Sequence, residues 1–239
     1  YRIFKGFYNV RFYMREMQGR CDSLVYFYDD SLLYLFQKPM LWSDENEIYG
    51  DTIKVWMKNG QADSMWLGQG AFLISEEDTV GYNQIKGKEM RASFREGKLS
   101  KLAVLGNSES IYFAKEEDST STTYQGMNQA LSQSMNLYFE DNDLKKIVFL
   151  AQPEGSFRPM FEILDLPNRL EGMRWEPENR TERPDVEAIM SGLWPPYVEA
   201  ELLPLEEGEV PEAILPGEEI DESDIDPQPL EITIPPDDK

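Results

Sequence analysis

Residues 85–105, IKGKEMRASFREGKLSKLAVL, contain the pattern that decides the fold. Every second residue of the segment 90–94 is apolar, which is the period of two that is typical of a half-buried strand. A turn signal at residues 96–97 follows, and the segment 101–104 then resumes the alternation. The stretch therefore predicts a β-hairpin with one apolar face.

Copies of this hairpin recur along the first 150 residues and align position for position. The first strands start 37 and 45 residues apart, and the polar insertion 116–124 fills the larger gap. A looser copy begins at Leu24. The inward apolar positions are Ile53, Val55 and Met57, then Met90, Ala92 and Phe94, then Met135, Leu137 and Phe139, with Met65, Leu67, Leu102, Val104, Ile147 and Phe149 on the returning strands. Repeats of this length indicate stacked units that bury their apolar faces against one another.

The other face of these strands carries charged residues such as Lys54, Arg91 and Glu140. We therefore expect only one dry side, with no strand apolar on both faces. Such hairpins can close into a barrel, pack as a sandwich or form a half-open shell. The apolar face is accordingly either a closed core or a groove for a hydrophobic ligand, since flexible Met and flat Phe side chains also suit acyl chains.

Proline usage divides the chain, because 14 of the 15 prolines lie at or after Pro153. Prolines are excluded from central strands, so residues 1–152 are predicted to form the sheet and residues 153–194 an irregular extension. Within this extension only Arg183–Leu193 has the pattern of a short helix. Residues 195–239 form an acidic Pro-rich tail, which lies either on a partner protein or along its own domain.

Charge and composition narrow the classes of function. The net charge is −22, of which the 15 acids and one lysine from residue 199 onward contribute −14. This balance argues against nucleic acid as a partner, because binding to a phosphate backbone requires a basic surface. Cys21 is the only cysteine, and we expect it to be a small buried apolar residue. The opening YRIFKGF suggests a processed or partial chain from which an export signal would be missing.

The chain lacks the residues of common active sites. It contains no histidine, which excludes Ser-His-Asp and Cys-His arrangements and removes the usual zinc donors. Gly68-Gln69-Gly70 is too short for a phosphate loop and predicts a bulge or a corner of the sheet. Acidic pairs at residues 29–30, 76–77 and 116–117 have the character of solvated loops. We therefore expect no enzymatic activity, no metal and no cofactor.

Several motifs resemble one family. Residues 48–53 (IYGDTI), 85–90 (IKGKEM) and 106–113 (GNSESIYF), with 170–175 (LEGMRW) and 180–189, are similar to the OstA-like proteins of Bacteroidetes-type bacteria. These belong with LptA, the periplasmic lipopolysaccharide-transport protein. The resemblance covers roughly residues 1–190.

The resemblance implies an all-β fold, an open antiparallel β-jellyroll folded over like a taco, whose inner face holds the acyl chains of lipid A. It implies a periplasmic location associated with the outer membrane, and head-to-tail contacts with an LptD-like translocon and other Lpt β-jellyroll domains. The implied lipid-binding residues are Ile53, Val55, Met57, Met90, Ala92, Phe94, Leu102, Val104, Met135, Leu137, Phe139, Ile147 and Phe149.

A second hypothesis comes from the same sequence features. The stacked hairpins could form a closed solenoid that acts as a structural adaptor, with edge strands and the acidic tail holding an outer-membrane complex together. An enzyme that acts on envelope glycans is a third and weaker hypothesis.

Overall fold

The computed structural model describes residues 2–14, 17–77, 81–117, 122–140, 143–163, 168–183, 187, 190–191 and 230–233. Its strands are β1 (Ile3–Tyr13), β2 (Gln18–Phe27), β3 (Leu32–Phe36), β4 (Met40–Ser43), β5 (Asn46–Tyr49), β6 (Thr52–Lys58), β7 (Gln61–Leu67), β8 (Ala71–Glu77), β9 (Gly81–Gly87), β10 (Glu89–Arg95), β11 (Lys98–Glu117), β12 (Thr122–Glu140), β13 (Asp143–Leu150), β14 (Glu154–Pro159) and β15 (Leu230–Thr233). The helical elements are α1 (Met160–Ile163) and η1 (Pro177–Asn179). Among the described residues, no helix has the length and apolar character needed to cross a bilayer.

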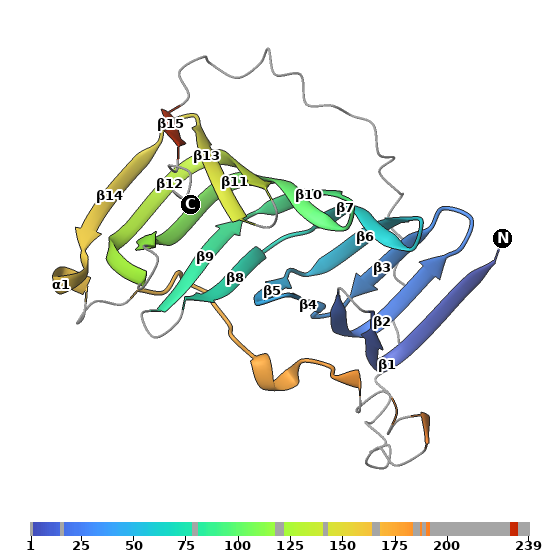
Figure 1. The fold of residues 1–239 in the computed structure, drawn as a ribbon. Coiled ribbons are helices and arrows are strands. Elements are labelled where there is room, and N and C mark those ends of the chain that lie inside the picture. Colours follow the sequence, from blue (N-terminus) through green and yellow to red (C-terminus); the bar gives the residue numbers. More distant parts are fainter. Residues whose placement is uncertain are drawn as a thin grey trace.

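The strands form one antiparallel sheet that folds over on itself (Figure 1). Three long strands, β2, β11 and β12, pass from one layer to the other, because each pairs with different neighbours along its two halves. The upper layer contains β3, β6, β7, β10 and β13, and the lower layer contains β4, β5, β8, β9 and β14. This all-β architecture confirms the jellyroll-like fold that the sequence predicts.

The hairpin turns and the corners between layers lie along opposite edges of the folded sheet. Turns at residues 44–45, 59–60 and 96–97 define one edge, here called the mouth. Corners at residues 50–51 and 68–70 carry the chain from one layer to the other and define the opposite edge, here called the spine. The mouth is therefore the side on which the two layers are joined by no short connection.

Local sequence explains both kinds of connection. Asn59 and Gly60 have φ values of 52° and 80°, and Glu96 and Gly97 have values of 54° and 79°. Positive φ at both central residues is the signature of the type I′ turn, which matches the twist of a hairpin. The segment 68–70 is a spine corner, as predicted, with the Asp51 N–H donating to the Gln69 carbonyl at 3.0 Å.

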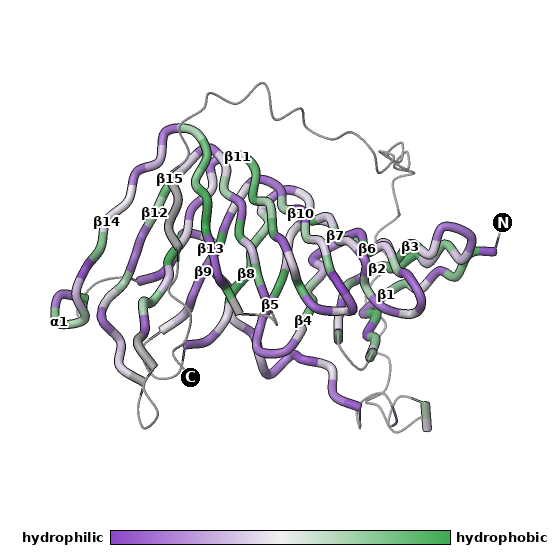
Figure 2. The backbone as a smooth tube through the Cα atoms, turned by 45° about the horizontal axis from the view of Figure 1, so that its top comes forward, coloured by the Kyte–Doolittle hydropathy of each residue, from purple (hydrophilic) through white to green (hydrophobic). Residues whose placement is uncertain are grey.

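Three rows of apolar side chains cross the interior face of the upper layer, because successive hairpins pair in the same register. The spine row is Leu35, Ile53, Leu67, Met90, Val104, Met135 and Phe149; the middle row is Leu33, Val55, Met65, Ala92, Leu102, Leu137 and Ile147; the mouth row is Met57, Ala62, Phe94, Leu99, Phe139 and Leu144. The first two rows are buried, whereas the mouth row is half-buried. Figure 2 shows hydrophobic residues within the strands of the folded sheet and hydrophilic residues at many of the turns between them.

A bulge at the same position of three hairpins creates the mouth row. The register shifts between Trp56 and Met57, and equivalent shifts occur in the β10–β11 and β12–β13 hairpins. The residues that the register skips on the returning strands are Asp63, Ser100 and Lys145. Without the extra residue, strict alternation would direct these polar side chains inward. The bulge instead places an apolar residue at the inner position beside the mouth.

The outer face of the lower layer carries a second core, which corrects the prediction of a single dry side. This core contains Met40, Trp42, Tyr49, Phe72, Ile74, Ile111, Phe113, Met127, Ile163 and Leu170. The run 71–74 of β8 is buried at all four positions, so this strand is apolar on both faces. A strand that is covered on both sides loses its alternation, and Ile163 together with residues of the segment 168–181 provides the outer cover. We call the segment 168–181 the strap; it lies below the lower layer in Figure 1.

The extension from residue 153 also differs from the prediction. The sequence predicts an irregular segment from residue 153 onward. In the structure, β14 pairs with the first half of β12 and continues the lower layer to Pro159. Proline is tolerated there because it ends a strand that, among the described residues, pairs with β12 alone. The sheet therefore extends seven residues beyond the predicted boundary at residue 152.

The C-terminal predictions are tested only in part. Arg183, Glu187 and Met190 are helical, in agreement with the short helix predicted over 183–193, and the rest of that segment is only partly described. In the tail, β15 pairs with β13 on the chain's own upper layer. Residues 195–229 and 234–239 lie outside the described part of the chain.

We predict that the strap contributes to stability as a core element. Leu170 is 6% exposed in the second core, so Leu170→Ala should lower the free energy of unfolding by about 2–4 kcal/mol through lost burial and a residual cavity. Urea unfolding measures this change. The control is Phe161→Ala, because Phe161 is 76% exposed and its truncation should cost less than about 0.5 kcal/mol. Equal effects of the two substitutions would contradict a packed strap.

Candidate functional site

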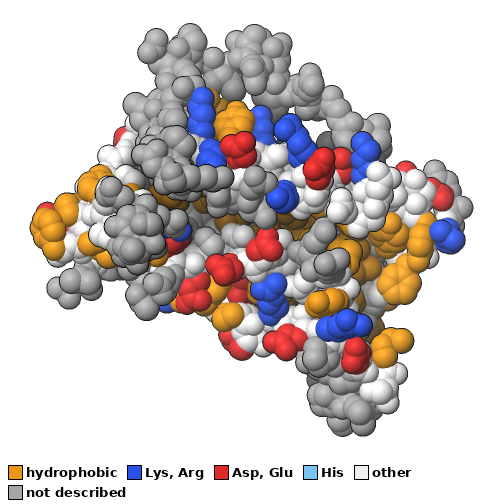
Figure 3. Space-filling model, viewed as in Figure 1, with side chains coloured by type: hydrophobic (Ala, Val, Ile, Leu, Met, Phe, Trp, Pro, Cys, Tyr) orange, Lys and Arg blue, Asp and Glu red, His pale blue; other side chains and the backbone are white. Residues whose placement is uncertain are grey.

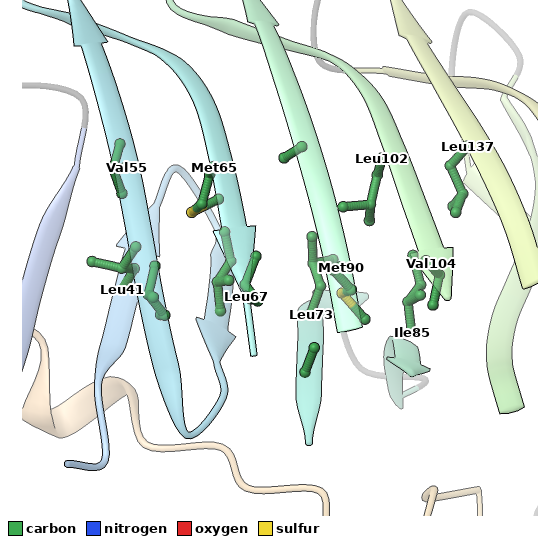
Figure 4. Close-up of a cluster of buried hydrophobic side chains, with 14 of the residues drawn as sticks. Leu41, Val55, Met65, Leu67, Leu73, Ile85, Met90, Leu102, Val104 and Leu137 are labelled. Carbon is green, nitrogen blue, oxygen red and sulfur yellow. The ribbon is translucent and has the colours of Figure 1, made fainter. Parts of the chain in front are cut away.

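A cavity of about 190 Å³ lies between the two layers and opens at the mouth. Its upper wall comes mainly from the middle and mouth rows, with Leu67 and Met90 of the spine row, and its lower wall includes Ile48 and Leu73. Figure 4 shows Val55, Met65, Leu102 and Leu137 of the upper layer together with Leu41, Leu73 and Ile85 of the lower layer. The residues between the turns of the two layers thus form an apolar groove, which we call the mouth groove.

All 13 sequence-predicted residues belong to the core between the layers, but they divide into two groups. The residues that line the mouth groove are Val55, Met57, Met90, Ala92, Phe94, Leu102 and Phe139. The residues that do not line it are Ile53, Val104, Met135, Leu137, Ile147 and Phe149. The second group is at most 7% exposed. The inner face is therefore a groove along β6, β7 and β10 toward the mouth, and a closed core toward the spine and toward β12 and β13, where Phe139 alone of the predicted residues reaches the groove.

The sequence reasoning missed several residues that line the groove. Met14 and Met17 come from the β1–β2 connection, and Ile48 and Leu73 come from the lower layer. Ala62 and Leu99 were missed because the bulges break the alternation that was followed. In the sequence, Ala62 and Leu99 are apolar although they lie three residues, an odd number, before the inward positions Met65 and Leu102. This break in the alternation is the signal that could have identified both residues.

The acidic pairs considered as catalytic candidates have different environments. Glu76 is exposed, but Glu77 is held in a network: it accepts hydrogen bonds from Asn83 Nδ2 at 2.6 Å and from the Tyr124 hydroxyl at 3.1 Å. The Lys115 ammonium lies 3.2 Å from the same carboxylate. Glu77 is thus a paired strand residue rather than a solvated loop residue. No group of three or more possible metal ligands occurs within the residues that the structure describes.

Glu47 is the most buried carboxylate of the lower layer and joins the strap to the sheet. It is 1% exposed and accepts a hydrogen bond from Trp42 Nε1 at 3.0 Å. The Glu176 N–H of the strap donates to both of its oxygens, at 3.1 and 3.0 Å. Burial raises the pKa of Glu47 above its ordinary 4.5, while these hydrogen bonds act in the opposite direction. The Glu47 carboxylate therefore holds the strap in place by hydrogen bonds, although burial disfavours its charged form.

Other buried polar side chains hold the remaining length of the strap. Gln84 donates to the Asn168 carbonyl at 2.7 Å and accepts from the Leu170 N–H at 2.8 Å. The Tyr49 hydroxyl accepts from the Arg174 N–H at 2.8 Å, and burial raises the pKa of Tyr49. These contacts satisfy strap backbone groups that would otherwise be buried without a partner.

Cys21 has the environment predicted for it. It is 5% exposed within the core between the layers. Burial, with a smaller contribution from Asp22, raises the pKa of its thiol to about 12. A thiol of this kind stays protonated at neutral pH and is therefore a poor nucleophile.

Comparisons of the chain with protein-family models, curated proteins and solved structures found no match. The site is therefore interpreted from its own geometry. That geometry combines an apolar mouth groove inside the folded sheet with a polar strap contact outside it.

We predict that Glu47 makes stability depend on pH. The pKa of Glu47 is raised in the folded state. The contribution of Glu47 to the free energy of unfolding is therefore fully present below about pH 4.5, and it is lost as the pH rises through the folded-state pKa. Glu47→Gln removes this titration. The free energy of unfolding of the variant, relative to that of the parent, should therefore be more favourable at pH 7 than at pH 4.5. Urea unfolding at both pH values measures the difference.

The control for this experiment is Glu45→Gln, which removes the same charge from an exposed position of the same hairpin. If the difference in free energy of unfolding between the Glu47→Gln variant and the parent is the same at both pH values, the role assigned to the buried carboxylate is contradicted.

Proposed function

We propose that this chain is a non-enzymatic lipid carrier that transports lipopolysaccharide across the periplasm to an outer-membrane translocon. The observation that carries the proposal is the mouth row, in which six apolar residues remain half-buried beside a cavity in an otherwise closed core. A core with no ligand to bind gains nothing from leaving Met57, Phe94 and Phe139 partly open to water.

The chemistry of the groove suits acyl chains. Its walls are formed largely by Met, Leu and Phe, whose side chains adapt to a flexible ligand. Each methylene removed from water contributes about 0.8 kcal/mol, so a few methylenes of each chain are enough for binding. Passive burial gives no direction to transport, which on this proposal comes from partner proteins.

The sheet edges support the proposed partners. β1 pairs with β2 alone among the described strands, and Phe4 and Phe7 on it are about half exposed. β14 at the other end pairs with β12 alone in the same part of the chain, and Phe157 on it is 51% exposed. Unpaired edges with apolar side chains are suited to strand addition by another β-jellyroll domain or the translocon.

A structural adaptor is the second candidate function, and β15 is the observation that favours it. This tail strand pairs with the edge of β13, so the tail has a sequence that can add to a sheet. On the adaptor hypothesis the tail adds in the same way to a partner protein.

We predict that charges in the mouth row abolish lipid binding. Phe94→Asp and Phe139→Asp should each reduce photo-crosslinking of lipopolysaccharide to a probe at position 57 by at least about tenfold, because a buried carboxylate next to an acyl chain is strongly unfavourable. Ser93→Asp is the matched control, since it adds the same charge at an exposed neighbouring position. Unchanged crosslinking in folded Phe94→Asp protein would refute the carrier proposal.

Deletion of residues 195–239 separates the two candidate functions. A carrier should still load lipid after the deletion, whereas an adaptor should no longer co-purify with its outer-membrane partners. Mass spectrometry of an organic extract and affinity purification of the truncated protein measure the two outcomes. Loss of lipid together with retention of partners would contradict both assignments.

A further inference from the structure

The β4–β5 hairpin separates the mouth groove from a second pocket. Ser43, Asp44, Asn46 and Ile48 of this hairpin line the groove. Trp42, Glu45 and Glu47 of the same hairpin line a pocket of about 520 Å³ on the outside of the lower layer. One two-stranded ribbon of backbone is therefore all that lies between an apolar cavity and a polar one.

The outer pocket contains two carboxylates that are exposed to solvent. Glu45 lies at the tip of the hairpin and Glu76 near the end of β8. The other charged residues of the pocket already have partners: Glu47 binds the strap, and Arg180 donates to Gln18 Oε1 at 2.9 and 2.7 Å and to the Asp44 carbonyl at 2.6 Å. The acceptors of Arg180 are neutral, so its positive charge remains in the pocket beside the two exposed carboxylates, which outnumber it.

An indole ring completes the outer pocket. Trp175 of the strap is half-buried there and packs against Tyr82, with 5.2 Å between the ring centroids and the ring planes tilted by 53°. Carboxylates beside an indole face are the combination that binds an ammonium group, through ion pairing and cation–π attraction.

The opposite rim of the mouth carries basic side chains, together with exposed acidic residues such as Glu96. Lys58 and Arg95 are exposed beside the hairpin turns of the upper layer. In Figure 3, Lys and Arg side chains are interspersed with Asp and Glu side chains in the upper part of the view, and both signs also occur in the lower part, with hydrophobic side chains between them. A headgroup that bears both a phosphate and an amine matches this distribution.

We propose that the outer pocket binds the amine of a zwitterionic lipid headgroup while the acyl chain of the same lipid lies in the mouth groove. The ligand then crosses the β4–β5 hairpin at its tip. This inference rests on the proposed lipid-carrier function and adds the class of headgroup to it.

Calorimetric titration with monomeric short-chain lipids tests the inference. The probes are dihexanoyl phosphatidylethanolamine, its N-acetylated form, which lacks the positive charge, and dihexanoyl phosphatidic acid. The full chain should bind the first about tenfold more tightly than the other two, the size expected for a partly exposed ion pair with a cation–π contact. Because Glu45 and Glu76 are exposed, Glu45→Gln/Glu76→Gln should fold normally and bring the three affinities within about twofold.

The matched control is Asp29→Asn/Asp30→Asn, which removes two exposed carboxylates from the β2–β3 turn and should leave the preference unchanged. Equal affinities of the full chain for the three lipids, or a preference that survives in the Glu45→Gln/Glu76→Gln variant, would overturn the headgroup inference and leave the carrier proposal standing. Failure to bind any of the lipids would overturn both.

Discussion

The common register of the hairpins is the constraint on which the rest of the structure depends. Because each hairpin pairs with the next without slipping, inward residues of different strands fall into continuous rows. A slip of one residue anywhere in the upper layer would bring Lys54 or Arg91 into the interior. In three hairpins of the upper layer, a bulge shifts the register where the rows reach the mouth. Further shifts lie in the β1–β2 pair and along β11–β12, beyond the part of that pair that belongs to the rows. Register therefore fixes both the closed core and the position of the groove.

The two layers differ in how many of their faces are buried. The upper layer is dry on one face, so its outer residues include charges and cation–aromatic pairs such as Lys54 with Tyr34 and Trp66. Strands β4, β5 and β8 of the lower layer are largely buried on both faces and depend on the strap, where Glu47, Tyr49 and Gln84 accept hydrogen bonds from backbone N–H groups. Burying these polar groups has a cost, and the hydrogen bonds offset it. The strap is thus held in one position along the sheet by directional bonds as well as by apolar contact.

The sequence predicted the fold class, the turns and the inward positions of the upper layer, because alternation and turn residues are local signals. It did not predict the lower layer's second face. The run Ala71-Phe72-Leu73-Ile74 has no alternation, and its meaning depends on residues about a hundred positions later. The same limit applies to the site: the rows could be read from the sequence, but which members are sealed and which face the groove depends on how the two layers approach each other.

The position of the strap in the sequence means that it is synthesised after the sheet face that it covers. The outer apolar face that it covers is built from strands between Met40 and Met127, whereas the strap itself begins at residue 168. During synthesis, the hairpins leave the ribosome tens of residues before the segment that shields them. A chain in this state exposes an apolar sheet face to its surroundings, which favours aggregation. Biogenesis of the protein therefore requires either rapid completion of the chain or a chaperone that holds this face until the strap arrives.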